Sequence, residues 1–191
     1  MRDIDIYDFD KTVYPTDSTM QFWLFCLARY PYIIVYLPVQ IIFLIMWVVK
    51  ILPTGVFKSL FMRFVAIIPT EKAVKAFWNK NEKNIYEWFR KENRERYTVV
   101  ISASPDYLLG EIANRLQVDK LICTKGDSKT GKLVGKNCKG EEKVKRLNSE
   151  MRDFNVVCVY SDSLKSDAPI FALGKKKIHT VAGKLISMEE N

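Results

Sequence analysis

The stretch IDIYDFDKTVYPTDST, residues 4 to 19, places two carboxylates, Asp8 and Asp10, at the end of an apolar segment. The segment IDIYDF alternates β-branched and aromatic residues with polar ones, a pattern typical of a short buried strand. Two carboxylates so close together repel each other, and loss of solvent increases the repulsion. A divalent cation is the natural compensation. The stretch therefore predicts a strand that ends at a cation site.

Composition bounds the class of protein. The chain has 191 residues, 48% of them hydrophobic, which is enough for one good core and a smaller appended unit. Its net charge of +8 suits a phosphorylated substrate, an acidic membrane surface or a nucleic acid, although charge alone favours ordinary solubility. Four cysteines without CxxC spacing and a single histidine predict reduced thiols and no zinc site. The N-terminus lacks the apolar core of a signal peptide, so we expect it in the cytoplasm.

Two kinds of pattern divide the chain. Residues 98–180 alternate strand, helix, strand, helix, strand, which predicts a parallel sheet with helices on both faces. Residues 12–97 are helical in pattern and interrupt the sheet after its first strand. We therefore expect an α/β, Rossmann-like fold. Residues 1–11 and 98–191 would form the core, and residues 12–97 would form an inserted, all-helical, strongly apolar cap.

Individual elements follow from local patterns. Residues 71–96 predict one amphipathic helix with Thr70 as its N-cap. Asp17 is either the N-cap of a helix that begins at Ser18 or a cap residue that lines the substrate site. His179 has no motif around it, so we expect a structural role on a strand. The other predicted elements are strands at 97–105, 120–124, 154–161 and 176–183, helices at 106–117, 141–151 and 168–174, and a glycine-punctuated hairpin or loop at 125–143.

Polar side chains gather where the predicted strands end, at the edge where open α/β sheets bind ligands. Carboxylates for a cation, hydroxyl and backbone N–H groups for an oxyanion, and one lysine suit phosphoryl transfer. An aspartate can act as the nucleophile, and a second carboxylate two residues on can protonate the leaving oxygen and then activate water. The residues concerned are Asp8, Asp10, Ser102, Ala103, Ser104, Lys143, Ser161, Asp162, Ser163 and Asp167.

Four motifs together resemble the haloacid dehalogenase superfamily. DFDKTVY is similar to its first motif, DxDx[TV], and VVISASP to its second, an apolar strand that ends in Ser or Thr. EEKVKRL supplies the lysine of the third motif, and VYSDSLKSD supplies the acidic pair of the fourth. Each motif alone is weak evidence, but all four occur in order at predicted strand or helix ends. The resemblance implies the Rossmann-like superfamily fold with a helical, C1-type cap.

The resemblance also implies the catalytic roles. Asp8 would be the nucleophile that forms an aspartyl phosphate, and Asp10 would be the general acid and base. Ser102 would hold the phosphoryl oxygens, together with the backbone at Ala103. Lys143 would neutralise the nucleophile and the phosphate.

The same resemblance implies a Mg²⁺ site. Asp8 would bind the ion with its carboxylate and Asp10 with its main-chain carbonyl. Asp162 would be the third residue of the metal site. Asp167 would support the metal shell directly or through water, and its spacing of five from Asp162 differs from the four of some subfamilies.

The segment PYIIVYLPVQIIFLIMWVV, residues 31–49, has no charge, and Gln40 is its only strongly polar side chain. Its length is borderline for a membrane-spanning helix. The strands before and after it must share one side of any membrane, so a single crossing is excluded. With Pro38 near its middle, we expect a kinked or re-entrant helical hairpin in the cytoplasmic leaflet. The alternative is a cap that packs on itself or on a second subunit. Basic residues that would meet acidic headgroups are Arg29, Lys50, Lys58 and Arg63.

Within the superfamily, the chain resembles the phosphoserine phosphatase-like subfamily IB. It is closer still to the bacterial phosphatidylglycerophosphatase C family in its apolar cap, its CKGEEK stretch and its YSDS motif. Phosphoserine enzymes usually carry a cap glutamate after the first motif, whereas this chain reads YPTDST, with Asp17 at best a substitute.

The sequence therefore predicts a Mg²⁺-dependent phosphomonoesterase at the cytoplasmic side of a bacterial inner membrane, acting on a lipid phosphate such as phosphatidylglycerophosphate. The first alternative is a soluble cytoplasmic phosphatase of a small molecule such as phosphoserine. The second is an inactive, membrane-associated scaffold. No RNA-binding signature is present, so no nucleic-acid partner is expected.

Overall fold

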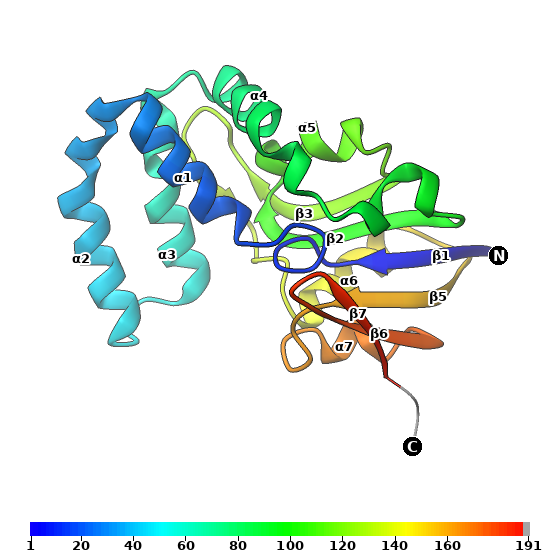
Figure 1. Ribbon diagram of the computed structural model, residues 1–191. Helices are drawn as coiled ribbons and strands as arrows, with labels where there is room; N and C mark the ends of the chain where they lie inside the picture. Colours follow the sequence, from blue (N-terminus) through cyan, green and yellow to red (C-terminus); the bar gives the residue numbers. More distant parts are fainter. Residues whose placement is uncertain (189–191) are drawn as a thin grey trace.

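The protein, described here over residues 1–188 of a computed structural model, is built on one seven-stranded sheet (Figure 1). The strand order is β4-β3-β2-β1-β5-β6-β7. The four neighbouring pairs from β3 to β6 are parallel, while β4 and β7 are antiparallel edge strands. This confirms the predicted α/β fold. The strands are β1 (Arg2–Tyr7), β2 (Tyr97–Pro105), β3 (Lys120–Gly126), β4 (Leu133–Val134), β5 (Phe154–Ser161), β6 (Lys176–Val181) and β7 (Lys184–Met188).

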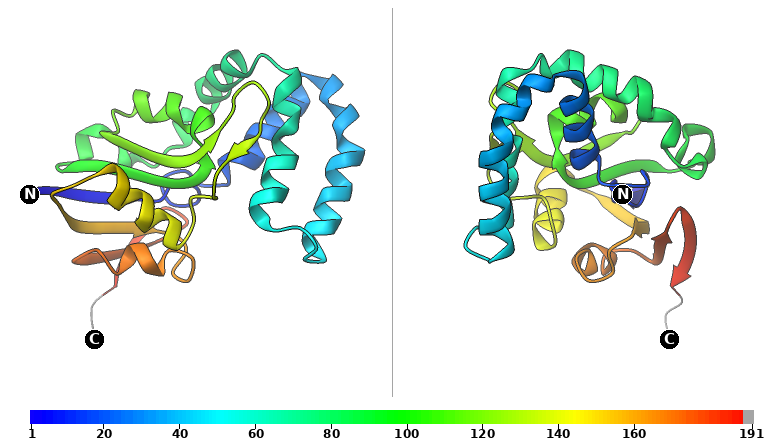
Figure 2. Two further views of the ribbon diagram at one scale, coloured as in Figure 1. Left: turned by 180° about the vertical axis from the view of Figure 1, so that it is seen from behind. Right: turned by 60° about the vertical axis from the view of Figure 1, so that its left-hand side comes forward.

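Helices cover both faces of the sheet, as the alternating pattern predicts (Figures 1 and 2). On one face, α5 (Asp106–Arg115) buries Leu108 and Ile112 in a core cluster that also contains Tyr7 of β1. On the other face, α6 (Glu141–Glu150) and the short α7 (Ala168–Phe171) pack in a second cluster with the β1 residues Ile4 and Ile6. Because β1 is buried on both faces, it fixes the centre of the fold.

The chain between β1 and β2 is helical. Its first and last helices belong to the body of the protein, because Phe22 of α1 and Trp78 of α4 lie in the same core cluster as α5. The indole N–H of Trp78 donates to the carbonyl of Leu108, 2.7 Å away. The predicted core and cap boundaries stay a prediction. The elements are α1 (Ser18–Arg29), η1 (Pro31–Tyr36), α2 (Leu37–Val48), α3 (Thr54–Phe61), η2 (Met62–Ile67), α4 (Thr70–Asn81), η3 (Glu82–Asn84), η4 (Glu87–Phe89) and η5 (Lys91–Asn93).

The predicted helix over residues 71–96 is wrong beyond Asn81, where α4 ends and short 3₁₀ turns follow. Tertiary hydrogen bonds replace helical ones in this segment. The backbone N–H of Tyr86 donates to the carbonyl of Val13, 3.1 Å away, and so ties the segment to the loop after β1. The predicted N-cap is also displaced, because Thr70 is the first helical residue and its hydroxyl donates to the carbonyl of Val65.

Helices α2 and α3 form a hairpin that projects from the rest of the molecule (Figures 1 and 2). Of the described residues, one helical stretch, Pro31–Val48, is long and apolar enough to cross a membrane, with a mean hydropathy of 2.1. Only 11% of that stretch is buried. We call its exposed apolar residues and those of the following turn the hairpin face. These are Tyr32, Ile34, Val35, Val39, Ile41, Ile42, Leu44, Ile45, Trp47, Val48, Val49 and Ile51.

The other helix of this hairpin, α3, is fixed to the β3–β4 hairpin of the sheet. The backbone N–H of Leu133 donates to the hydroxyl of Ser59, 3.0 Å away. Next to this bond, Gly131 adopts a positive φ of 70° and lies so close to η2 that an added Cβ would be 2.0 Å from the carbonyl oxygen of Met62. Glycine at position 131 therefore permits both the turn and the close approach of the two segments.

We expect Gly131→Ala to destabilise the protein much more than Gly135→Ala, which serves as the matched control. Both residues have positive φ, but a Cβ at Gly135 would meet nothing within 4 Å. Each alanine carries about 1–2 kcal/mol of backbone strain, and the clash at Gly131 adds about 1–3 kcal/mol. The free energy of unfolding in urea measures the difference. Equal losses in the two variants would contradict the close contact with Met62.

Candidate active site

The candidate site is a cleft of about 220 Å³ at the carboxyl ends of β1, β2 and β5. These ends meet because the three strands are parallel neighbours in the sheet. Side chains of the helical block, including Lys58 of α3, complete the wall. The cleft is lined by every residue to which the sequence assigns a catalytic, phosphate-binding or metal-binding role, whereas Ser104 and Ser161 contact these residues from outside the lining. The residues with these roles are Asp8, Asp10, Ser102, Ala103, Lys143, Asp162 and Asp167.

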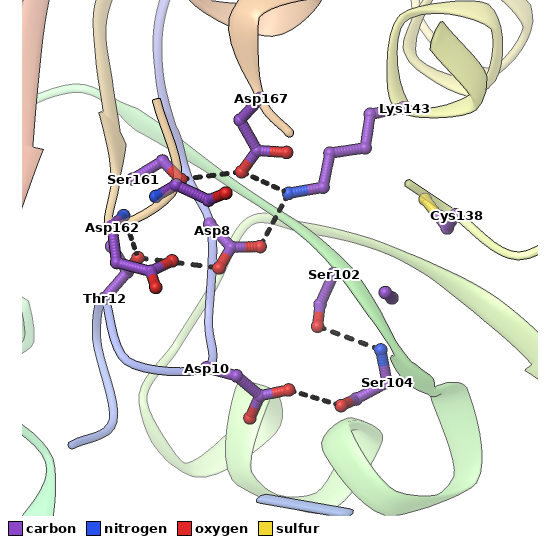
Figure 3. Close-up of polar contacts among 12 residues, drawn as sticks. Asp8, Asp10, Thr12, Ser102, Ser104, Cys138, Lys143, Ser161, Asp162 and Asp167 are labelled. Carbon is purple, nitrogen blue, oxygen red and sulfur yellow. Dashed lines mark hydrogen bonds and ion pairs between the residues drawn. The ribbon is translucent and has the colours of Figure 1, made fainter. Parts of the chain in front are cut away.

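Three charged residues form the floor of the cleft, and we call them the ion triplet: Asp8, Lys143 and Asp167 (Figure 3). The Nζ of Lys143 donates to Asp8 Oδ1 at 2.6 Å and to Asp167 Oδ2 at 2.8 Å. Asp167 Oδ2 also accepts from the hydroxyl of Ser161 at 2.6 Å. Lys143 and Asp167 are each 3% exposed. The lysine is therefore held between its two partners with little rotational freedom.

Burial shapes the electrostatics of the ion triplet. Loss of solvent raises the pKa of Asp8 from 3.8 to about 7, and Lys143 opposes that rise while Asp167 and Asp10 add to it. Burial alone would lower the pKa of Lys143, but the carboxylates of Asp8 and Asp167 outweigh it and raise that pKa. Lys143 therefore stays an ammonium, whereas Asp8 needs more positive charge nearby to be fully ionised at neutral pH.

Asp10 is held by the start of α1 and the end of β2. Its Oδ1 accepts from the backbone N–H of Ser18 at 2.8 Å, and its Oδ2 accepts from the hydroxyl of Ser104 at 2.5 Å. Burial raises the pKa of Asp10, the charge of Asp17 adds to the rise, and these hydrogen bonds oppose it. A raised pKa favours the protonated form that a general acid needs.

The sequence placed Ser104 in a strand-end cluster but gave no role to Ser18, which binds Asp10 across eight residues of chain. Asp17 is the N-cap of α1, since its Oδ1 accepts from Met20 N at 2.9 Å. It also lines the cleft. Both alternatives for Asp17 therefore describe its position, and its contact with a substrate stays a prediction.

Thr12 joins the loops after β1 and β5. Its hydroxyl oxygen accepts from the backbone N–H of Asp162 at 2.9 Å and contacts Asp8 Oδ2 at 3.5 Å (Figure 3). On the other side, a ring nitrogen of His179 lies 3.0 Å from the carbonyl oxygen of Asp162. Sequence reasoning gave neither Thr12 nor His179 this role. The threonine of the DxDx[TV] pattern was the available signal for the first, and nothing local signalled the second.

Lys11 lies between Asp10 and Thr12 of the first motif and has a φ of 61°. A glycine would adopt this left-handed conformation without strain, whereas the lysine adopts it at some cost in backbone strain. Lys11 and Asp162 line the same cleft, and burial raises the pKa of Asp162 while the charge of Lys11 opposes that rise.

Ser102 and Ser161 end their strands in the same way. The hydroxyl oxygen of Ser102 accepts from the N–H of Ser104 at 3.1 Å, and that of Ser161 accepts from the N–H of Ser163 at 3.1 Å. The hydroxyl of Ser161 donates its own hydrogen bond to Asp167. Ser102 has no such acceptor among the described residues and lines the cleft together with Ala103, so its hydroxyl can donate to an oxyanion, and the N–H of Ala103 stays the predicted second donor.

The donor set fits Mg²⁺, which binds one or two carboxylates, water and substrate phosphate at near-octahedral geometry. The carboxylates of Asp8 and Asp162, with the main-chain carbonyl of Asp10, would hold it. Both carboxylates have raised pKa values because burial leaves them short of positive charge. In the described chain, three or more acidic, His or Cys side chains do not converge on one point, so further ligands would be oxygens of water and phosphate. Asp167 Oδ2 is already engaged by Lys143 and Ser161, and its support of the metal shell stays a prediction.

Comparison with known families identifies the superfamily. Residues 6–172 match the haloacid dehalogenase-like hydrolase family. The chain belongs to this family. The matched region runs from β1 to just beyond α7 and includes all of the predicted site residues. The resemblance that the four motifs carry is therefore confirmed at the level of the superfamily. No curated protein matched the chain.

Solved structures share the fold at low sequence identity. A protein of unknown function from Bordetella pertussis Tohama I aligns with a TM-score of 0.71 and 18% identity, over 94% of this chain and 90% of its own. A phosphoserine phosphohydrolase-like protein from Francisella tularensis subsp. tularensis SCHU S4 gives 0.58 and 15%, over 94% and 87%. A phosphoserine phosphatase in its apo form gives 0.51 and 18%, over 93% and 85%. At these identities the likeness establishes the fold.

We expect Mg²⁺ binding to weaken as the pH falls from 8 to 5. The pKa of Asp8 is raised to about 7, so below that pH the ion has to displace a proton, and affinity drops by up to about tenfold per pH unit for each proton displaced. Isothermal titration calorimetry with MgCl₂ at several pH values, in buffers of different ionisation enthalpy, measures both the affinity and the proton release. Asp8→Asn should remove most of this pH dependence between 6 and 8. A pH-independent affinity of the unmodified protein would contradict the assignment.

Proposed function

We propose that the protein is a Mg²⁺-dependent phosphomonoesterase that works through an aspartyl-phosphate intermediate on Asp8. The observation that carries the proposal is the ion triplet, in which a buried lysine holds Asp8 at the base of a cleft. A phosphoryl group that enters this cleft meets a carboxylate nucleophile, an ammonium and the hydroxyl of Ser102, which has no acceptor among the described residues. Those are the components that phosphoryl transfer requires.

The roles of the side chains follow from their surroundings. Asp8 attacks the phosphorus and forms a P–O bond to its carboxylate, while the bond to the leaving alcohol breaks. Protonated Asp10 gives its proton to the departing oxygen. The resulting Asp10 carboxylate then takes a proton from a water molecule that attacks the phosphoryl group, so that Asp8 and inorganic phosphate are released.

Lys143, Ser102 and the N–H of Ala103 balance the charge on the phosphoryl oxygens during both steps. Asp167 fixes Lys143 in place, so it acts as a positioning residue. When bound, Mg²⁺ supplies additional positive charge at the same oxygens. The buried hydroxyl of Ser161 orients Asp167 in turn.

We expect Asp8→Asn to lower kcat by roughly 10³-fold or more, because the amide can neither attack phosphorus nor form the intermediate. Initial rates of p-nitrophenyl phosphate hydrolysis with Mg²⁺ measure the loss. Asp153→Asn is the matched control, since Asp153 lies in a turn outside the cleft with φ 55°, a conformation that asparagine also tolerates. A folded Asp8→Asn protein with near-normal turnover would rule out Asp8 as nucleophile.

The proposed substrate is a phosphorylated membrane lipid, with phosphatidylglycerophosphate as the specific candidate. The support is the inverted polarity of α2. Its only buried residue is Gln40, which accepts from the indole N–H of Trp23 at 3.2 Å and donates to the carbonyl of Phe61 at 2.9 Å. The aliphatic residues of the hairpin face, by contrast, are exposed, and only Ile41 and Leu44 among them also line the apolar cavity between α1, α2 and α3. A helix that satisfies its polar group internally and exposes its apolar ones matches a lipid environment.

This assignment places the enzyme at the cytoplasmic side of a bacterial inner membrane. Because β1 and β2 flank the helical block and pair in one sheet, the α2–α3 hairpin has to enter and leave on the same side. A net charge of +8 and basic residues near the hairpin favour an anionic leaflet. The chain's resemblance to phosphatidylglycerophosphatase C in its CKGEEK and YSDS stretches agrees with this substrate.

A small soluble phosphomonoester is the second candidate. The observation in its favour is the fold likeness to the phosphoserine phosphohydrolase-like protein of Francisella tularensis, together with a cleft of only about 220 Å³. In that case the hairpin face would be covered by protein. Activity on vesicle-embedded lipid separates the two substrate classes.

We expect the double variant Ile42→Lys, Leu44→Lys to release the protein from anionic vesicles, because two charges on the hairpin face oppose insertion. Co-sedimentation with vesicles of phosphatidylglycerol and phosphatidylethanolamine measures binding. The matched control is Leu185→Lys, Ile186→Lys, which places the same charges on exposed apolar residues of the edge strand β7. Equal pelleting of the two variants would refute a membrane-seated hairpin.

A further inference from the structure

The cleft holds more positive charge than one phosphomonoester requires. Four lysines line it. Lys143 belongs to the ion triplet, and Lys11, without a direct ion pair in the described part of the chain, shares the cleft lining with Asp162, whose pKa its charge lowers. The other two, Lys58 and Lys139, form no ion pair with any residue between 1 and 188. Two ammonium groups therefore remain for an anion beyond the scissile phosphate.

Lys58 and Lys139 come from adjacent elements. Lys58 lies on α3, and Lys139 lies on the loop that precedes α6. These elements are in contact, since a Cβ built on Gly55 of α3 would be 3.9 Å from the Cβ of Asn137. Both lysines and Asn137 line the same cleft. The two charges therefore come from neighbouring elements of one cleft, α3 and the loop before α6, and not from β1, which the nucleophile follows.

The backbone that carries Lys58 is fixed. The next residue, Ser59, accepts the hydrogen bond from Leu133 of the β3–β4 hairpin, and the Gly131 contact with Met62 closes the same junction. Only the flexible stem of Lys58 has to be ordered when an anion binds, so much of the entropic cost of recruiting this charge is already met by folding.

Helix α3 also separates two environments. Thr54 and Lys58, one turn apart, face the polar cleft. Phe57 and Phe61 face an apolar cavity of about 150 Å³ between α1, α2 and α3, whose lining includes Trp23. A ligand in the cleft that continues toward the hairpin thus passes Lys58 at the boundary between polar and apolar surroundings.

We propose that Lys58 and Lys139 form a subsite for a second anionic group on the leaving-alcohol side of the substrate, and that this group is a phosphodiester. The inference rests on the proposed phosphomonoesterase function and narrows its substrate class. The scissile phosphate lies over Asp8, and the phosphodiester binds the two lysines, which attract its charge across the mouth of the cleft. Selectivity then comes from the distance between two phosphates.

Two pairs of substrates test the subsite. In detergent micelles, phosphatidylglycerophosphate carries the second phosphate and phosphatidic acid lacks it, with identical acyl chains. In solution, glycerophosphoglycerophosphate and glycerol 3-phosphate differ in the same way. We expect Lys58→Gln to lower the ratio of kcat/KM between the two members of a pair by about tenfold, the loss expected for one charged hydrogen bond. The loss should be in KM, because the subsite binds the ground state and the transition state alike.

Lys75→Gln is the matched control, because Lys75 of α4 lies outside the cleft, and it should leave the ratio unchanged. Lys58→Arg should retain most of the ratio, whereas Lys58→Glu should lower it further than Lys58→Gln. An equal loss on both members of each pair, or no loss on either, would overturn the proposal.

The lipid pair and the soluble pair of substrates also distinguish failure of the subsite from failure of the proposed function. If the ratio falls only in the lipid pair, the phosphodiester is that of a membrane lipid, and if only in the soluble pair, it is that of a free metabolite. If the unmodified protein hydrolyses none of the substrates, the proposed function fails. Calorimetric binding of glycerophosphoglycerophosphate to the unmodified protein and to Lys58→Gln then decides the subsite alone, and equal affinities would overturn it.

Discussion

The ion pairs of Lys143 with Asp8 and Asp167 are the constraint on which the rest of the site depends. Strands β1 and β5 bring carboxylates to one edge of the sheet, and burial there raises the pKa of Asp8 to about 7 even with Lys143 beside it. Without a buried cation, that edge would hold neutral acids, which are poor nucleophiles and poor metal ligands. Helix α6 supplies the cation from the far face of the sheet. The lysine therefore lowers the pKa of Asp8 and shifts it toward the ionised form, and a bound cation would complete the ionisation.

Hydroxyl groups connect the pieces of this edge. Thr12 links the loops after β1 and β5, and Ser161 orients Asp167 for Lys143. Ser104 and Ser18 hold Asp10 apart from the ion triplet. The two aspartates of the first motif consequently have different environments: one contacts an ammonium, the other neutral donors. This difference is what lets neighbouring carboxylates act as nucleophile and as general acid.

Local pattern predicted the fold and the clustering of the site, because strand alternation and strand-end polar residues are both local signals. It could not predict where tertiary bonds override helix propensity, as at Tyr86, whose N–H goes to Val13. Strand β7 was also missed. All five of its residues are exposed, so no alternation marks it, and the turn before it uses Ala182 at φ 48°, where sequence rules look for Asn or Gly. The hydrogen bond from Ser18 to Asp10 depends on where the first turn of α1 lies relative to Asp10, and the spacing of residues in the sequence does not give that position.

The hairpin face and the cleft are structurally connected, because helix α3 packs against α2 and also lines the cleft. Helix α2 buries its glutamine and exposes its aliphatic residues. In water this arrangement is unfavourable, because a buried amide costs free energy unless it is hydrogen-bonded and a large apolar surface remains in contact with solvent. It becomes favourable when the outer face meets hydrocarbon. Helix α3 then stands between hydrocarbon and cleft, with Phe57 on one side and Lys58 on the other. A phosphorylated headgroup whose acyl chains stay in the bilayer would reach Asp8 along this helix, so the surface proposed to bind the membrane is also the one proposed to select the substrate.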